Sequence, residues 1–240
     1  MKTFILSALF SFLLIPAESF AQIKLPQILP GKKTSTGITE NEAGEGIKEA
    51  LAQGLARAVL QLNKEDGFFK DALYKVLMPP DAKKMENTLR KMGMGNMVDK
   101  AILQINRAAE DAAGQAKPIF VDAIKSMTIA DAIGLLKNGD TSATHFFRVK
   151  TTGKLAEAFT PVIKNSLDRL DATKYYSDVV GTYNNLPTTF KKANPDLTGH
   201  VTGKAIEALF DLIGKEEKNI RQNMAARTSD LLKKVFGTKW

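Results

Sequence analysis

The stretch that decides the fold is residues 106–152, NRAAEDAAGQAKPIFVDAIKSMTIADAIGLLKNGDTSATHFFRVKTT. Apolar residues leading into it recur at intervals of three and four, the period of an α-helix that buries one side. This stripe consists of Val98, Ala101, Ile105, Ala108 and Ala112. Its alanines are small, so a neighbouring helix can approach closely. Pro118 then suits the first turn of a new helix, where its missing N–H group costs nothing. The stretch therefore predicts several helices joined by tight corners.

The corners themselves carry helix-capping residues. Thr128 followed by Asp131 resembles a capping box, with Asp in place of the usual Glu or Gln. The Asn-Gly pair at 138–139 predicts a left-handed residue that ends this short helix. Asp140 or Thr141 can then cap the next helix. Helix N-termini at such corners can receive an anion; the alternative is that the protein's own side chains cap them.

The rest of the chain is also mainly helical in pattern. Residues 68–80 are the least clear, because their weak alternation favours a strand. Pro161 is expected to bend or split the long helix that contains it. We predict an all-α fold, a compact multi-helix bundle of about eight or nine helices, some short. Besides the central stretch, helices are expected over residues 46–62, 81–92, 152–170, 171–185 and 198–222, and after a cap at Thr228; a polar connection is expected over 187–197.

The N-terminus has the pattern of an export signal. Lys2 precedes an apolar run over residues 4–15, Pro16 breaks it, and small residues follow at the usual cleavage spacing. We expect a signal peptide over 1–21, cleaved near Ala21-Gln22, and an exported, periplasmic protein. The run is short for a membrane anchor. A flexible N-terminal linker over 22–43 and a single helical domain over 44–240 are expected to follow.

Composition limits the possible chemistry. The 240 residues include no cysteine, which excludes disulfides, thiolate catalysis and zinc–thiolate sites. Hydrophobic residues make up 44% and charged residues 25%, which is ordinary for a globular protein. The formal charge is +8, but the basic residues are scattered as doublets. We expect these basic residues to lie on the solvent-exposed surface, and we do not expect nucleic acid as a partner.

Several segments carry a family resemblance. They are NRAAEDAA, KPIFVDAIKSMTIADA, LLKNGDTSATHFFRVKT and AARTSDLLKKVFG. In that order they resemble a family of exported bacterial proteins of unknown function, with a signal peptide followed by one helical domain. The resemblance runs over about residues 46–237. It implies an all-α domain in the cell envelope and brings no activity, ligand or catalytic residue.

Polar residues near the central corners are the candidate binding residues. They are Asn106, Arg107, Glu110, Asp140, Thr141, His145 and Arg148. In a shared cleft, Arg107 and Arg148 would make charge-assisted contacts with an anionic ligand, and His145 would be a pH-dependent donor. The alternative is that Arg107 pairs with an acid on its own helix. The adjacent carboxylates at 110–111 and 216–217 are expected to be solvated, with Glu217 and Arg221 forming a modest surface ion pair.

No motif of an enzyme or cofactor site is present. The sequence contains no HExxH, P-loop, GxSxG or GxGxxG pattern. Asp140 and His145 lie across a predicted cap, a poor geometry for a metal, so no metal or cofactor is expected. A triad assembled from distant residues stays open, because triads are not local in sequence. Catalytic residues are therefore unknown.

Three hypotheses for function follow. The first is a non-enzymatic periplasmic binding or interaction module for a small anion, a lipid or an envelope partner. Clustered methionines (Met78, Met85, Met92, Met94 and Met97) could line an apolar groove for a lipid, although core filling is their more frequent role. The second is an enzyme, for example a hydrolase, with a site around Arg107, Glu110, His145 and Arg148. The third is a structural envelope protein.

Overall fold

The computed structural model describes residues 37–187 and 197–240. The predicted signal peptide, most of the predicted linker and most of the polar connection at 187–197 lie outside these residues. The described part is all-α, as predicted, and contains no β-strand. Its elements are α1 (Glu40–Leu62), η1 (Pro80–Ala82), α2 (Lys83–Lys91), α3 (Gly95–Ala113), α4 (Ala116–Ser126), α5 (Ile129–Lys137), α6 (Ser142–Arg169), α7 (Ala172–Asn184), α8 (Thr198–Gln222), η2 (Met224–Ala226) and α9 (Asp230–Phe236).

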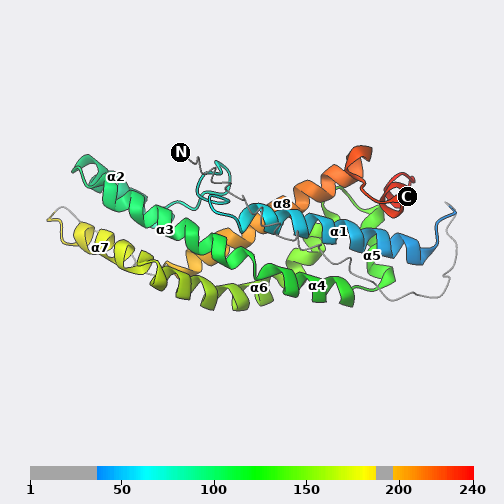
Figure 1. The fold of residues 1–240 in the computed structure, drawn as a ribbon, viewed down its shortest axis with the longest axis horizontal. Coiled ribbons are helices and arrows are strands. Elements are labelled where there is room, and N and C mark those ends of the chain that lie inside the picture. Colours follow the sequence, from blue (N-terminus) through cyan, green and yellow to red (C-terminus); the bar gives the residue numbers. More distant parts are fainter. Residues whose placement is uncertain (1–36, 188–196) are drawn as a thin grey trace, which may run out of the picture.

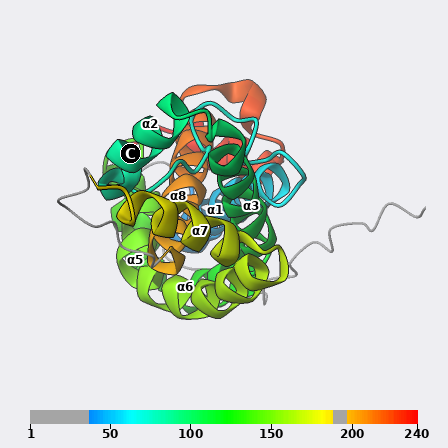
Figure 2. The same ribbon diagram turned by 90° about the vertical axis from the view of Figure 1, so that its left-hand side faces the viewer.

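The helices form an elongated bundle around α8. Figure 1 shows α8 running along the long axis beside α1, with α6 along the opposite side. Figure 2, seen from one end, places α8 and α1 near the middle, with α3 and α6 around them. Helices α2, α3 and α7 make up one end of the bundle, and α4, α5 and α9 lie toward the other. Helices α3 and α6, which carry most of the candidate residues, therefore both run along the body of the bundle.

The alanine-rich stripe of α3 is confirmed as a core surface. All its predicted members, Val98, Ala101, Ile105, Ala108 and Ala112, are fully buried. Helix α3 packs against α6, α7 and α8. Burial of an apolar stripe on several neighbours is the main source of helix stability in a bundle.

Helix α1 begins earlier than predicted. It starts at Glu40 rather than near residue 46, inside the stretch expected to be linker. Thr39 and Glu42 form a capping box, in which the Thr39 side chain accepts the Glu42 N–H and the Glu42 carboxylate accepts the Thr39 N–H. Ile38 is only 2% exposed and joins the core. The helical domain therefore includes residues 37–43.

Helix α6 is not split at Pro161, and no new helix begins near residue 152 as had been predicted. It runs for 28 residues through Thr152 and Pro161. The Thr152 hydroxyl donates to the Arg148 carbonyl of its own helix instead of capping a new one. Leu155 and Ile163 are fully buried on the two sides of the proline. Packing of this apolar face outweighs the hydrogen bond that Pro161 removes.

Two further helix ends differ from the predictions. Helix α5 ends at Asn138 in an extended conformation, and Gly139 does not adopt the left-handed conformation. The Ser142 hydroxyl and Arg221 donate to the Leu135 carbonyl instead, which satisfies this helix end. At the C-terminus, Ser229 caps α9 rather than Thr228.

The methionines and the single tryptophan are mainly part of the fold. Met78 and Met85 are buried in the core, which supports core filling for these two, whereas Met92 is 48% exposed. The Trp240 indole donates to the Val235 carbonyl at 2.8 Å and packs against the core. The last residue is therefore docked on the body. Within the described residues, no helix combines the length and apolar character needed to cross a bilayer.

Candidate functional site

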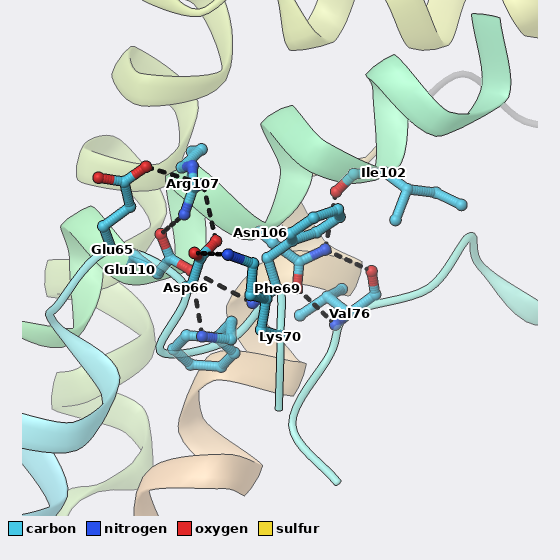
Figure 3. Close-up of polar contacts among 10 residues, drawn as sticks. Glu65, Asp66, Phe69, Lys70, Val76, Ile102, Asn106, Arg107 and Glu110 are labelled. Atoms are coloured by element: carbon cyan, nitrogen blue, oxygen red, sulfur yellow. Dashed lines mark hydrogen bonds and ion pairs between the residues drawn. The ribbon is translucent and has the colours of Figure 1, made fainter. Parts of the chain in front are cut away.

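The predicted residues on α3 belong to a closed polar network (Figure 3). Glu110, only 4% exposed, accepts the backbone N–H groups of Phe68 and Phe69 at 3.1 and 3.2 Å through Oε1. Its Oε2 accepts the Arg107 guanidinium at 2.7 Å. The predicted same-helix pair between Arg107 and Glu110 is therefore confirmed. Such a buried carboxylate is stabilised by its charge partner and its two amide donors together.

The remaining charges of this network also neutralise one another. Arg107 makes ion pairs with Glu65 and Asp66, and Asp66 pairs with Lys70 at 2.7 Å. Asp66 adopts a left-handed φ of 66°, which turns the chain after α1. Hydrogen bonds from Lys70 and then Arg107 hold the pKa of the Asp66 carboxyl below its usual range. Since its charges are already paired, the network fixes a loop rather than offering a free site.

Asn106, one turn earlier on α3, also fixes the loop that follows α1. Its side chain accepts the Val76 N–H and donates to the Val76 carbonyl, both at 2.8 Å (Figure 3). It also donates to the Ile102 carbonyl. Val76 thus receives the pair of bonds that a neighbouring strand would otherwise supply. This explains the strand-like alternation predicted at 68–80: Tyr74, Val76 and Met78 are buried, but on helices, and no strand forms.

The N-terminus of α6 is occupied by another buried carboxylate. Glu217 of α8, 3% exposed, accepts the backbone N–H groups of Ala143 and Thr144 at 3.1 and 2.7 Å. Arg221 pairs with Glu217 at 2.8 Å. Neither predicted residue caps the helix: Thr141 makes no side-chain cap, and Asp140 accepts a hydrogen bond from Gln222. The prediction that Glu217 is solvated is wrong, because it serves as the anion for this helix end.

Beside this capped end, α6 and α8 form an open groove of about 300 Å³. We call it the basic groove; it is lined by Thr141, Thr144, His145, Arg148, Phe210, Asp211, Gly214, Lys215 and Lys218. The Arg148 guanidinium lies over the Phe210 ring, 4.6 Å from its centroid. A cation held this way is attracted by the ring face and keeps its N–H donors available. Arg148 forms no ion pair with any residue that the structure describes, although its charge acts on Asp211 in the same groove.

Asp211 and Lys215 join this groove to a neighbouring one of about 360 Å³ that includes Tyr74. Lys215 pairs with Asp211 at 2.8 Å, and the Tyr74 hydroxyl donates to Asp211 at 2.6 Å. Burial opposes ionisation of Asp211, but hydrogen bonds from Lys215 and Tyr74 hold its pKa below the usual range. Asp211 and then Tyr74 raise the pKa of Lys215. The groove therefore keeps a fixed ion pair at one edge.

The structure places six of the seven predicted site residues in two sets. Thr141, His145 and Arg148 share the basic groove, whereas the α3 residues contact residues 65–76 and do not line it. Asp140 belongs to neither set, because it accepts a hydrogen bond from Gln222 and does not line the groove. These residues do not form the single cleft that would join both sets. Asp211, Lys215 and Lys218 on the α8 side of the groove were missed. Together with Lys204 and Glu207 of the neighbouring groove, they repeat at intervals of three and four. That polar stripe opposite the apolar one was the available signal.

A metal site and the hypothesised enzyme site would each require particular side chains to lie close together. In residues 37–187 and 197–240, no group of three or more His, Asp or Glu side chains is arranged to hold a metal ion. The buried acids Glu110 and Glu217 both bind backbone amides and an arginine. An enzyme site around Arg107, Glu110, His145 and Arg148 would need these groups together, and the structure separates them.

The fold and the groove define an all-α domain with a small basic surface site. The chain belongs to the family described as "Protein of unknown function (DUF4197)", whose model matches residues 37–237. This agrees with the resemblance found in the sequence. No curated protein and no solved structure matches the chain.

Proposed function

We propose that this protein is a non-enzymatic binding module that takes a small anion in the basic groove between α6 and α8. The observation that carries the proposal is the placement of Arg148. Its guanidinium is held over Phe210 and forms no direct ion pair within the described residues; Asp211, on which its charge acts, is paired with Lys215. An arginine fixed by stacking loses little side-chain freedom when it binds an oxyanion.

The neighbouring groups support the same ligand class. His145 and Lys218 line the groove with Arg148. The acid of the groove, Asp211, is already engaged by Lys215 and Tyr74. Its charge is thus compensated, and the exposed donors face the space that an anion would enter.

Calorimetric titration of the purified protein with pyrophosphate tests the proposal. We expect saturable binding that Arg148→Gln weakens by roughly tenfold or more, since a charge-assisted contact contributes about 1.5–3 kcal/mol. Arg148→Lys should fall between the two, because it keeps the charge but loses the planar donor pair. Arg169→Gln is the matched control: it removes an exposed arginine from the other end of α6. Equal affinities for all four proteins, or no saturable binding, would contradict the proposal.

We further propose that the protein acts in the periplasm, on the basis of the export signal predicted over residues 1–21. Cell fractionation with a C-terminal tag tests this. The tagged protein should be released with the periplasmic fraction, and mass spectrometry should find Gln22 as its first residue. A chain that lacks residues 1–21 should stay in the cytoplasm. Retention of the intact chain there, with Met1 still attached, would contradict the proposal.

A further inference from the structure

A separate cavity lies on another side of α6, between α4, α5 and α6. Its volume is about 440 Å³, within the range of about 300–1,000 Å³ typical of small-ligand sites. It shares no lining residue with the basic groove. It is lined by Asp122, Ala123, Ser126, Met127, Asp131, Phe146, Phe147, Lys150, Thr151 and Lys154. Three helices thus enclose it with side chains of two contrasting kinds.

The inner wall of this cavity is apolar and partly aromatic. Phe147 and Met127 belong to the buried core, and Phe146 is half-buried. The Phe146 and Phe147 rings meet edge to face, with centroids 5.8 Å apart. Phe146 therefore has a ring that core neighbours hold in place and that still reaches the cavity. A flat apolar group stacked on such a ring would be removed from water.

The outer rim is cationic on the α6 side. Lys150 and Lys154 are exposed and stand at i, i+4, where two like charges repel each other. Neither ammonium forms an ion pair within the described residues, and Lys150 lies 5.6 Å from the centroid of Phe146. An anion between the two lysines would relieve their repulsion. The apolar wall and the lysine pair thus stand next to each other on one helix.

The two acidic residues of the rim lie on the α4 and α5 side, and one of them already accepts hydrogen bonds within the protein. Asp131 Oδ2 accepts both the N–H and the hydroxyl of Thr128, which caps α5. Lys150 contributes to the field at this carboxylate. Asp122 is the other acid. These acids disfavour a ligand with several negative charges and are compatible with a single charge directed at the lysines.

We propose that this cavity binds a small amphipathic anion, with a flat apolar body against Phe146 and one carboxylate or sulfonate at Lys150 and Lys154. The site is independent of the basic groove. Both parts of the ligand are required: the ring supplies burial and the charge supplies direction. An uncharged aromatic molecule of the same size should therefore bind more weakly, and a bare inorganic anion should not bind.

The test uses three probes on the purified protein: 1-naphthalenesulfonate, 1-naphthylmethanol and inorganic sulfate, each titrated by calorimetry. We expect saturable binding of 1-naphthalenesulfonate, binding of 1-naphthylmethanol weaker by roughly tenfold, and none of sulfate over the same range. Equal binding of the sulfonate and the alcohol would overturn the role of the lysines. Absence of saturable sulfonate binding would overturn the site.

Variants then locate the bound probe. The double variant Lys150→Gln/Lys154→Gln should weaken sulfonate binding by roughly tenfold, whereas Lys83→Gln/Lys84→Gln, an equal loss of charge on α2, should not. Phe146→Leu should weaken it too, with circular dichroism confirming the fold; unchanged affinity would overturn the stacked pose. Arg148→Gln should leave it unchanged. If Arg148→Gln alone reduces binding, the probe lies in the basic groove and this proposal fails, while the proposed function stands.

Discussion

Glu217 of α8 accepts both the backbone N–H and the hydroxyl of Thr144 on α6, at 2.7 and 2.6 Å. The positive end of the longest helix is thereby neutralised by a side chain from a helix 73 residues away in sequence. Arg221 balances the carboxylate on its other side. The sequence predicted an exposed helix end that could receive an external anion, and the protein's own carboxylate fills it. Arg148, which forms no ion pair within the described residues, lies beside this end in the basic groove.

Removing this carboxylate should destabilise the fold strongly. Glu217→Ala removes the only carboxylate paired with Arg221 within the described residues and leaves two buried N–H groups without an acceptor, so we expect a loss of about 3–5 kcal/mol in the free energy of unfolding. Glu217→Gln keeps an acceptor and should cost less, about 1–3 kcal/mol. Urea unfolding measures both. Glu207→Gln, at an exposed position of α8, should change stability by at most about 0.5 kcal/mol. A similar small change for Glu217→Ala would contradict this role.

Asn106 should be as important for the loop that follows α1. Asn106→Leu leaves both backbone groups of buried Val76 unpaired, so we expect a loss of about 2–4 kcal/mol. The Val76 amide should also exchange with solvent faster, because its acceptor is gone. Asn96→Leu, an exposed change on the same helix, is the control. Wild-type exchange at Val76 in the Asn106 variant would show that another group holds the loop.

The helices and their apolar faces could be predicted because their signals are local. The stripe from Val98 to Ala112 is one helix, and its period alone identifies the buried side. The roles of Glu110 and Glu217 could not be predicted in this way. Their amide partners lie 41 to 74 residues away, and only the packed structure brings them together. Both were expected to be solvated, since a carboxylate beside another acid usually is.

Only part of the candidate site could be predicted, because only the spacing of residues along a helix is visible in the sequence. Thr141, His145 and Arg148 follow a helical spacing, and they do share a groove. Arg107 and Glu110 share a helix face too, but the loop at 65–76 covers that face. Local residue preferences could not predict where this loop lies. The loop forms no helix or sheet, and side chains of α3 hold it in place. Whether two helices leave a cleft between them depends on which other segments cover their faces. The spacing of residues along one helix does not predict this.

Two glycines should respond in opposite directions to the same change. A Cβ at Gly46 on α1 would lie 2.7–2.9 Å from the Val235 side chain of α9, whereas nothing lies within 4 Å of a Cβ at Gly153 on α6. Gly153→Ala should stabilise by about 0.5–1 kcal/mol through helix propensity. Gly46→Ala should destabilise by about 1–2 kcal/mol, because overpacking outweighs that gain. Chemical unfolding compares the two. Equal stabilisation would mean that α9 is not closely packed on α1.

Acid should weaken the contact between the start of α1 and α9. Hydrogen bonds from Lys234 and from the Thr39 backbone lower the pKa of Glu42 from 4.5 to about 2. Because the folded-state pKa is the lower one, this stabilisation is complete above about pH 4.5 and is lost as the pH falls toward 2. Its size should be below about 1 kcal/mol, since both side chains are partly exposed and screened.

The stability difference between wild type and Glu42→Gln measures this contribution. The difference should be larger at pH 6 than at pH 2.5, and 1 M salt should reduce it at pH 6. A difference that grows as the pH falls would have the wrong sign and would exclude the ion pair as its source.

The central claim is that the basic groove between α6 and α8 receives a small anion. Its most direct test is a titration of the ¹⁵N-labelled protein with pyrophosphate, followed by amide chemical shifts. We predict saturable shifts at His145, Arg148, Gly214 and Lys218, with the amides around Lys83 and Lys84 on α2 unchanged. Shifts spread evenly over the lysine-bearing surfaces, or no saturable shift at the groove residues, would contradict the account.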